Sequence, residues 1–326
     1  MSDPVGQTRT DAFQTPILTL TLNPALDLST DVPTLVPDQK LRCSEPLLDP
    51  GGGGLNVSRA IATLGGESLA LVALGGLTGD RLAGLIRAES VPFLALTAPG
   101  ETRLSLTVTE RATGRQYRFM LPGPVWSGAD QDRVFMLLRA SARPGAYGVI
   151  SGSQPPGVPA DFPARLAQSM PGLRVVIDTS GPALHHAVAH PVPGLAILRM
   201  DGEEAEGLAG KPLTTRQDTA DFAQGLVRRG VAERVIVARG ADGNVLADAT
   251  RRIFANAAKV TVKSTVGAGD SFLAAFILTL SRGGTDEAAL AMAAAAASAA
   301  VTTDATQLCR LVDVQRLLPE CEVSEV

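Results

Sequence analysis

Residues 264–271 have the composition of an anion-binding turn that ends in a carboxylate. They read Ser-Thr-Val-Gly-Ala-Gly-Asp-Ser and directly precede an apolar helical run, 272–280. Gly267 and Gly269 let the main chain approach a phosphate closely, and a helix N-terminus attracts negative charge. Asp270 stands where it can accept a proton from an attacking hydroxyl. This pattern predicts phosphoryl transfer; the alternative is an ordinary helix start with Asp270 as a capping residue.

A second glycine cluster, residues 51–54, lies far upstream and is followed by Asn56 and an amphipathic helical pattern. Four consecutive glycines are costly to order, because glycine loses more backbone entropy on folding than other residues do. We therefore expect a ligand to touch the backbone here. The alternative is a flexible linker, but linkers are not normally followed at once by an amphipathic helix.

Strand and helix patterns alternate along the chain, which indicates an α/β fold with a parallel sheet covered on both faces. The expected strands are 17–22, 68–74, 149–151, 175–178, 196–199 and 234–238, and helical patterns such as 80–89, 161–168 and 215–230 lie between most of them. Polar side chains follow the carboxyl ends of these strands, among them Asp27, Ser153, Asp178 and Asp201. Open α/β sheets bind ligands at that edge.

Residues 28–48 and 102–121 break the alternation, because they read as strands without helices. We expect them to form a small separate sheet that acts as a lid. A kinase needs such a lid, since an open site would transfer the phosphoryl group to water. The alternative is a surface decoration without a role in the reaction.

These motifs together resemble the PfkB (ribokinase-like) family of sugar kinases, and within it the 6-phosphofructokinase subgroup. The matching segments run in order from about residue 17 to residue 312: 19–27, 40–43, the tetraglycine with Asn56, 151–153 with 155–157, and 265–271. The resemblance implies a three-layer α/β sandwich with a mainly parallel central sheet, built from residues 16–27, 49–101 and 122–326. It also implies that the lid pairs two subunits into a homodimer.

The resemblance assigns a role to each matching residue. Asp270 would be the catalytic base, and Gly267, Ala268 and Gly269 would form an anion hole. The sugar phosphate would contact Asp27, Lys40, Gly52, Gly53, Asn56, Arg103 and Ser153, with Arg103 and either Lys40 or Arg42 on its phosphate. ATP would contact Asp201, Arg239, Gly240, Gly243, Thr265 and Gly267. Magnesium would be placed by Glu204 and Asp201.

One segment departs from the family pattern. The family usually has Asn-x-x-Glu after a strand, whereas this chain has Asp201 and Glu204, preceded by Arg199. The change adds a negative charge beside the expected triphosphate, which either strengthens metal binding or repels the nucleotide. Asp201 with Glu204 also makes a capping box for the helix that follows, and both interpretations can hold together.

The predicted reaction is therefore ATP-dependent phosphorylation of the 1-hydroxyl of fructose 6-phosphate. Kinases for tagatose 6-phosphate and fructose 1-phosphate are the nearest alternatives; the tetraglycine and the segment 40–43 favour the 6-phosphofructokinase subgroup. A non-enzyme alternative is a sugar-phosphate-binding protein whose catalysis is impaired by the change at Asp201.

Composition agrees with a globular enzyme. The chain has 326 residues, 45% of them hydrophobic, and a net charge of −4 without a basic cluster, so we expect no nucleic-acid partner. Three cysteines without metal-ligand spacing indicate reduced thiols in the cytoplasm, with Cys43 buried. Residues 1–15 are polar and are expected to form a disordered tail. The apolar run 288–301 is too short to span a membrane and is expected to be a buried helix.

Overall fold

The computed structural model describes residues 14–304 and 306–326. Most of the expected disordered tail, residues 1–13, lies outside the described residues. The last two residues of the expected tail, Gln14 and Thr15, contact the body of the protein. The Thr15 amide donates to the carbonyl of Ser281 (2.8 Å), and the Gln14 side-chain amide donates to the carbonyl of Glu67 (2.6 Å).

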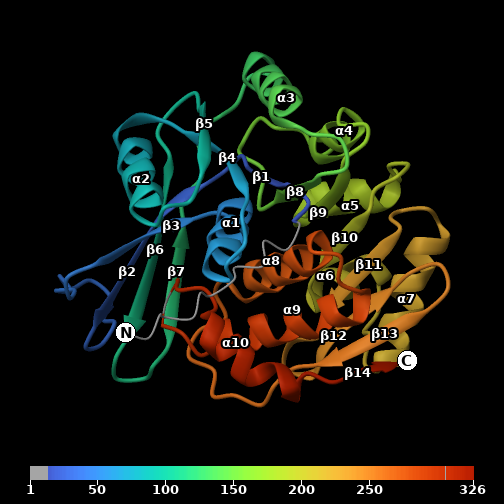
Figure 1. Cartoon of the computed structure of the whole chain (residues 1–326). Coiled ribbons are helices and arrows are strands. Elements are labelled where there is room, and N and C mark those ends of the chain that lie inside the picture. The colour runs from blue at the N-terminus through green and yellow to red at the C-terminus, as the bar shows by residue number, and fades with distance from the viewer. Residues whose placement is uncertain (1–13, 305) are drawn as a thin grey trace, which may run out of the picture.

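The larger sheet runs through the middle of the molecule (Figure 1). Within the described part of the chain it has ten strands in the order β14-β13-β12-β11-β10-β9-β8-β1-β4-β5. Their bounds are β1 Ile17–Thr21, β4 Leu69–Leu74, β5 Phe93–Thr97, β8 Tyr147–Ser151, β9 Arg174–Asp178, β10 Ile197–Met200, β11 Arg234–Ala238, β12 Gly243–Ala247, β13 Arg252–Asn256 and β14 Val323–Glu325. All neighbours from β5 to β11 are parallel, and β11 to β14 are antiparallel. The predicted, mainly parallel central sheet is confirmed.

Helices cover both faces of this sheet, which gives the expected three layers. One face packs against α1 (Gly53–Thr63), α2 (Gly76–Ala88), α8 (Ala268–Ser281), α9 (Asp286–Ala300) and α10 (Leu311–Leu317); the other packs against α3 (Gly128–Ser141), α4 (Phe162–Gln168), α5 (Gly181–Ala189), α6 (Gly202–Ala209) and α7 (Arg216–Arg228). Short 3₁₀ turns occupy Gly240–Asp242 and Leu318–Glu320. Strand alternation divides the core: Val176 points to the first face, whereas Val175 and Ile177 point to the second.

The expected buried helix in the apolar run is α9, which packs on α8. Ala293, Ala294, Ala295 and Ala296 are at most 1% exposed, because small side chains let the two helices approach closely. Thr285 caps the start of α9 by accepting from the Ala288 amide. Among the described residues, no helix has the length and apolarity needed to cross a bilayer.

The small sheet stands beside the large one, at the left of Figure 1. Its order is β3-β2-β6-β7, with bounds β2 Ala25–Val32, β3 Leu47–Gly51, β6 Arg103–Glu110 and β7 Gln116–Met120. On one face, Asp27 of β2 lies opposite Ser105 of β6. On the other face, Leu106 of β6 lies between Leu28 of β2 and Phe119 of β7. Because side chains alternate along strands, the sheet has a polar face that carries Asp27 and an apolar face that carries Phe119.

The segment between β2 and β3, residues 33–46, is largely exposed and includes Lys40 and Cys43. The expectation of a buried Cys43 was therefore wrong. The chain leaves the small sheet after Val32 and returns at Leu47, so no core covers this thiol.

Candidate active site

The N-terminus of α8 provides unpaired backbone amides beside a carboxylate. Gly267 caps the helix with φ of 72°, a left-handed conformation in which a side chain would be strained, and an added Cβ would meet Leu308 at 2.7 Å. Amides in the first turn of a helix have no acceptor within it. The Val266 amide is already paired, since it donates to the hydroxyl oxygen of Ser264 (3.2 Å). The positive end of α8 is thus formed by residues 267–270.

Asp270 lies in that first turn and is held by Asn56, which enters from α1. The Asn56 side-chain amide donates to Oδ2 of Asp270 at 2.9 Å, although 214 positions separate the two residues. Burial raises the pKa of Asp270 to about 6; the Asn56 hydrogen bond and the positive charges of Arg199 and Arg59 oppose that rise. A carboxylate with this pKa is ionised at neutral pH and can accept a proton.

The glycine cluster brings three elements close to this point. A Cβ on Gly51 would lie 2.2 Å from the Asp27 carboxylate, and one on Gly53 would lie 2.4 Å from the hydroxyl oxygen of Ser151. Gly52 has φ of 121°, which L side chains rarely adopt. The cluster is therefore explained by close packing against β2 and β8 at the start of α1.

Asp27 of β2 and Arg103 of β6 lie on the polar face of the small sheet, which we call the polar floor. Burial raises the pKa of Asp27 to about 6, and Arg103 and a hydrogen bond from Ser105 oppose that rise. Nε of Arg103 donates to the carbonyl of Asn23 (3.2 Å), while the Asn23 side-chain amide donates to the hydroxyl of Ser153 (3.1 Å). Ser153 is thus connected to Arg103 through Asn23, and Asn56 contacts Asp270 directly. The structure therefore ties four predicted sugar-phosphate residues to the polar floor or to Asp270: Asp27, Asn56, Arg103 and Ser153.

Acidic residues gather at the ends of β9 and β10. The predicted capping box of α6 is confirmed: the Asp201 carboxylate accepts from the Glu204 amide (2.8 Å), and the Glu204 carboxylate accepts from the Asp201 amide (2.9 Å). Arg199 donates to Asp178 at 3.0 Å. Its guanidinium also lies against α8, because a Cβ on Gly269 would be 2.9 Å from it. A fixed positive charge therefore stands between the acidic cluster and Asp270.

This acidic cluster fits a magnesium ion that is carried by nucleotide phosphates. Burial raises the pKa of Glu204, and the negative charges of Asp201 and Asp178 raise it further, so a nearby cation would relieve their repulsion. No group of three potential protein ligands occurs in residues 14–304 and 306–326. Magnesium in kinases is typically held by one or two carboxylates together with substrate phosphates, and Asp201 and Glu204 are two carboxylates of that kind.

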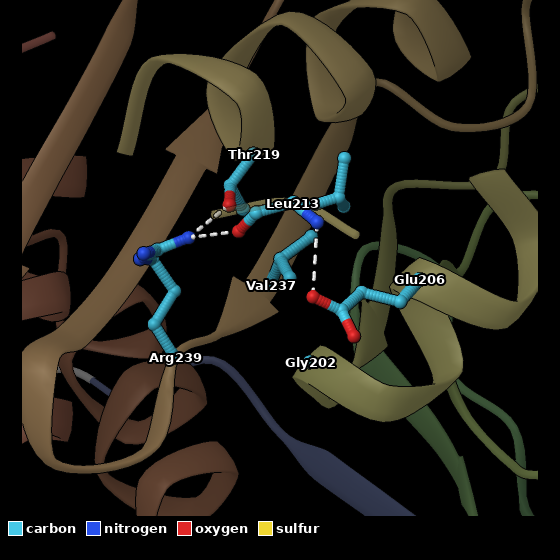
Figure 2. Close-up of a pocket in the computed structure, with 6 residues that line it drawn as sticks. All are labelled: Gly202, Glu206, Leu213, Thr219, Val237 and Arg239. Carbon is cyan, nitrogen blue, oxygen red and sulfur yellow. Dashed lines mark hydrogen bonds between the residues drawn. The ribbon is translucent and has the colours of Figure 1, made fainter. Parts of the chain in front are cut away.

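Arg239 lines a pocket of about 200 Å³ between α6 and α7 (Figure 2). Its guanidinium donates to Asp242, to the hydroxyl of Thr219 and to the carbonyls of residues 213, 214 and 215. Figure 2 also shows Glu206 accepting from the Leu213 amide (2.9 Å). The side chain of Arg239 thus fastens the loop between α6 and α7. Gly240 and Gly243 form the turn that follows it, with φ of 58° and 134°.

Three predicted residues are not brought into these contacts. Lys40 and Arg42 lie in the exposed segment between β2 and β3, and Thr265 is exposed just before α8. Conversely, the sequence motifs did not identify Arg59 and Glu89. These two residues form an ion pair next to Asn56, and Arg59 is buried in it. The signal was weak, because Arg59 sits one helical turn after Asn56 while Glu89 is 30 positions away.

Comparison with known proteins agrees with this geometry. The model of the pfkB family carbohydrate kinases matches residues 21–312. An ATP-dependent 6-phosphofructokinase isozyme 2 of Mycobacterium tuberculosis H37Rv is 39% identical over 92% of this chain and 88% of its own length. A 1-phosphofructokinase of Xanthomonas campestris is 31% identical over 93% of this chain and 94% of its own.

The fold matches as well. The crystal structure of phosphofructokinase-2 from Escherichia coli in complex with fructose-6-phosphate superposes with a TM-score of 0.86 at 36% identity, covering 94% of this chain and 99% of that one. The residues that the family model matches include the glycine cluster, all four strands of the small sheet and the α8 N-terminus. The chain belongs to the pfkB family of carbohydrate kinases, enzymes that transfer a phosphoryl group to a sugar hydroxyl.

Proposed function

We propose that this protein transfers the γ-phosphoryl group of ATP to the 1-hydroxyl of fructose 6-phosphate, giving fructose 1,6-bisphosphate and ADP. The observation that carries the proposal is the Asp270 carboxylate, which lies in the first turn of α8 with a pKa of about 6 and accepts a hydrogen bond from Asn56 at 2.9 Å. A proton acceptor is thus fixed beside a set of unpaired amides.

In this mechanism Asn56 occupies Oδ2 of Asp270, and Oδ1 receives the hydrogen bond of the acceptor hydroxyl. The hydroxyl oxygen attacks the γ-phosphorus, the bond to the bridging oxygen of ADP breaks, and the proton passes to Asp270 late in the step. The amides of residues 267–269 stabilise the negative charge on the transferred oxygens. Arg199, against Gly269, adds positive charge at the same place.

The nucleotide is assigned to the edge formed by α6, α8 and the turn 239–243. Asp201 and Glu204 would hold the magnesium ion, which neutralises phosphate charge when bound. Arg239 contributes indirectly, because its donors hold the loop between α6 and α7 in place. A direct contact between Arg239 and ATP, as predicted from the sequence, stays a prediction beside this role in shaping the site.

The sugar phosphate is assigned to the polar face of the small sheet. Asp27 would accept hydrogen bonds from sugar hydroxyls, and Arg103 would bind the 6-phosphate, where a guanidinium can make two parallel hydrogen bonds. Burial lowers the pKa of Arg103, and the negative charge of Asp27 opposes that effect. The negative charge of a bound phosphate would likewise stabilise the positive charge of the guanidinium. The higher identity to a 6-phosphofructokinase than to a 1-phosphofructokinase, 39% against 31%, favours fructose 6-phosphate as the acceptor.

The test is a coupled assay of ADP release with magnesium and ATP. Fructose 6-phosphate, tagatose 6-phosphate, fructose 1-phosphate and fructose are compared by kcat/KM. We expect fructose 6-phosphate to give the highest value. A preference for another sugar phosphate would contradict the proposed acceptor, and binding of these sugars without turnover would point to an impaired, binding-only protein.

We also propose that the apolar face of the small sheet pairs two subunits. Tyr117 is 38% exposed and Phe119 50% exposed; both lie on this face with Leu104, which is 37% exposed, and with Leu106. An exposed apolar sheet face of this kind is typical of a protein interface. Pairing would cover it while leaving the opposite, polar face to the sugar phosphate.

A further inference from the structure

A buried cation lies behind the proposed catalytic centre. Arg59 of α1 is 8% exposed and hydrogen-bonds to β3, to the end of α2 and to a residue of its own helix. Its Nε and Nη2 donate to the two carboxylate oxygens of Glu89, at the end of α2 (2.6 and 2.7 Å). Its Nη1 donates to the carbonyl of Pro50 in β3 (2.7 Å) and to Oδ1 of Asn56 (3.1 Å). Arg59 therefore joins β3, α1 and the end of α2 at one point.

The contact with Arg59 determines which way the Asn56 amide faces. A guanidinium has only donors, so it must meet the carbonyl oxygen of Asn56, and the amide nitrogen then faces Asp270. With the amide reversed, Asn56 would present hydrogens to Arg59 and an oxygen to the Asp270 carboxylate. Both contacts would be repulsive. The hydrogen bond that holds Asp270 is thus fixed by a residue that does not itself contact Asp270.

We propose that Arg59, braced by Glu89, is a positioning residue that holds Asn56 so that Asp270 keeps one oxygen directed at the acceptor hydroxyl. The proposal rests on the proposed role of Asp270 as the base. It makes the end of α2 part of the catalytic machinery, although α2 contributes no group to the proposed site. A displacement of a reacting group by about 1 Å can cost about a hundredfold in rate, so a second layer of this kind matters.

The charges around Asp270 come from several elements. Arg59 of α1 and Arg199 of β10 lower its pKa, and Asp178 at the end of β9 raises it. Glu204 of α6 acts on Arg199, and Arg59 also lowers the pKa of Asp27. Loss of Arg59 removes a positive charge and frees the Asn56 amide to turn. Both effects raise the pKa of Asp270.

Three variants separate the charge of Arg59 from its geometry. Arg59→Lys keeps the charge but cannot bond Glu89 at two atoms and also reach Pro50 and Asn56. We expect its kcat to fall about tenfold or more with a small shift in the acid limb of the pH profile. Arg59→Gln should show the same fall in kcat and a larger shift to higher pH. Glu89→Gln, at the partly exposed end of the pair, should lower kcat less than the Arg59 variants do. Because this substitution removes a negative charge and leaves that of Arg59 less neutralised, the acid limb should not shift to higher pH.

Two readouts test the proposal in the full-length protein. The first is kcat and KM for fructose 6-phosphate as functions of pH. The second is a ¹³C NMR titration of aspartate carboxyls without substrates, with the Asp270 signal identified by its loss in Asp270→Asn. The control is Arg252→Gln, which removes the ion pair between Arg252 of β13 and Asp221 of α7 and should move neither readout. Urea unfolding of each variant measures how much stability has been lost.

Each outcome bears on a single claim. A raised Asp270 midpoint and a reduced kcat in the Arg59 variants would support the positioning role. An unchanged midpoint and an acid limb that matches wild type would overturn it, even if stability falls. If the Arg59 variants do not fold, kcat of Glu89→Gln decides: a fall supports the role, and an unchanged kcat overturns it. If wild type turns over no sugar phosphate, the proposed function fails, and the NMR titration still shows whether Arg59 controls Asp270.

Discussion

Asp270 and Asp27 are two carboxyl groups for which burial raises the pKa to about 6 in each case. Both lie where negative charge is costly, and each is partly compensated by hydrogen bonds and by arginine. This arrangement keeps a proton acceptor near neutrality, where the transfer of a proton from a hydroxyl is most effective. The same burial makes both residues sources of pH dependence.

We expect kcat/KM for fructose 6-phosphate to fall below about pH 6. Both carboxyls must be ionised in the free enzyme, one to accept the proton and one to accept sugar hydroxyls, so the fall should approach about a hundredfold per pH unit. Steady-state kinetics between about pH 4.5 and about pH 8.5, a range in which the protein should stay folded, measure it. In Asp27→Asn the remaining activity should fall about tenfold per unit, because only one titrating carboxyl is left. An acid limb unchanged by this substitution would contradict the role of Asp27.

Asp270→Asn should abolish most turnover and stabilise the protein at neutral pH. The folded-state pKa lies above the ordinary value, so the ionised group lowers the free energy of unfolding above pH 6, by about 1–3 kcal/mol. That cost shrinks as pH falls through about 6 and vanishes near about pH 4, where the carboxyl is protonated in both states.

Urea unfolding of Asp270→Asn and wild type at about pH 7.5 and at about pH 4.5, on either side of the folded-state pKa, tests this. The exposed Asp132 offers a matched control, because Asp132→Asn removes one charge without relieving burial. Equal stability of Asp270→Asn and wild type at the higher pH would show that Asp270 carries no such cost.

Sequence reasoning identified the residues that sit within short motifs. Asp270 and Asn56 each belong to a glycine-rich helix start, a local pattern that a chain displays directly. The pair Arg59 and Glu89 was missed, because it depends on how α1 packs against α2. Arg239 shows another limit: its turn motif is visible in the sequence, but its hydrogen bonds to a loop more than twenty residues upstream are not.

At the scale of elements, the start of α6 combines a structural and a chemical role. Asp201 caps the helix and also belongs to the acidic cluster. Asparagine caps a helix about as well as aspartate does, whereas alanine does not. The two roles can therefore be separated by substitution at one position.

Asp201→Ala should lower the free energy of unfolding by about 1 kcal/mol, and Asp201→Asn should leave it unchanged. Both should raise the magnesium concentration needed for half-maximal turnover, because both remove a carboxylate beside the phosphates. Ser127→Ala, which removes the equivalent cap from α3, is the control: it should cost similar stability without a magnesium effect. A magnesium requirement that neither Asp201 variant alters would exclude Asp201 from the metal site.

Most parallel strands of the large sheet were predicted: β1, β4, β8, β9, β10 and β11 were expected within two residues of their observed bounds. The parallel edge strand β5 was not predicted. Neither were the antiparallel strands β12 to β14, which lie near turns. Their place in the sheet depends on pairing with β11 and not on a pattern of their own.

At the scale of the whole molecule, the small sheet is the part that is least covered. We expect the protein to be a dimer in solution and Phe119→Asp to make it monomeric, because a charge would be buried at the centre of the apolar face. Sedimentation velocity measures the change. Gln116→Asp lies on β7 with the opposite side-chain direction and should leave the dimer intact. A wild-type monomer, or a dimer that persists in Phe119→Asp, would contradict the proposed interface.

The path of the chain through the small sheet also sets an order for folding. β2 and β6 pair in parallel through eight residues each, yet β3, α1, β4, α2 and β5 lie between them in sequence. Contacts between distant segments form slowly, because the entropy of closing the loop must be lost before the pairing compensates for it. Of the intervening elements, α1, β4, α2 and β5 must therefore collapse into the large sheet and its helix layer first. The lid is then expected to be the last region to gain protection from hydrogen exchange during refolding, so newly made chains would carry a nucleotide edge before they can enclose a sugar.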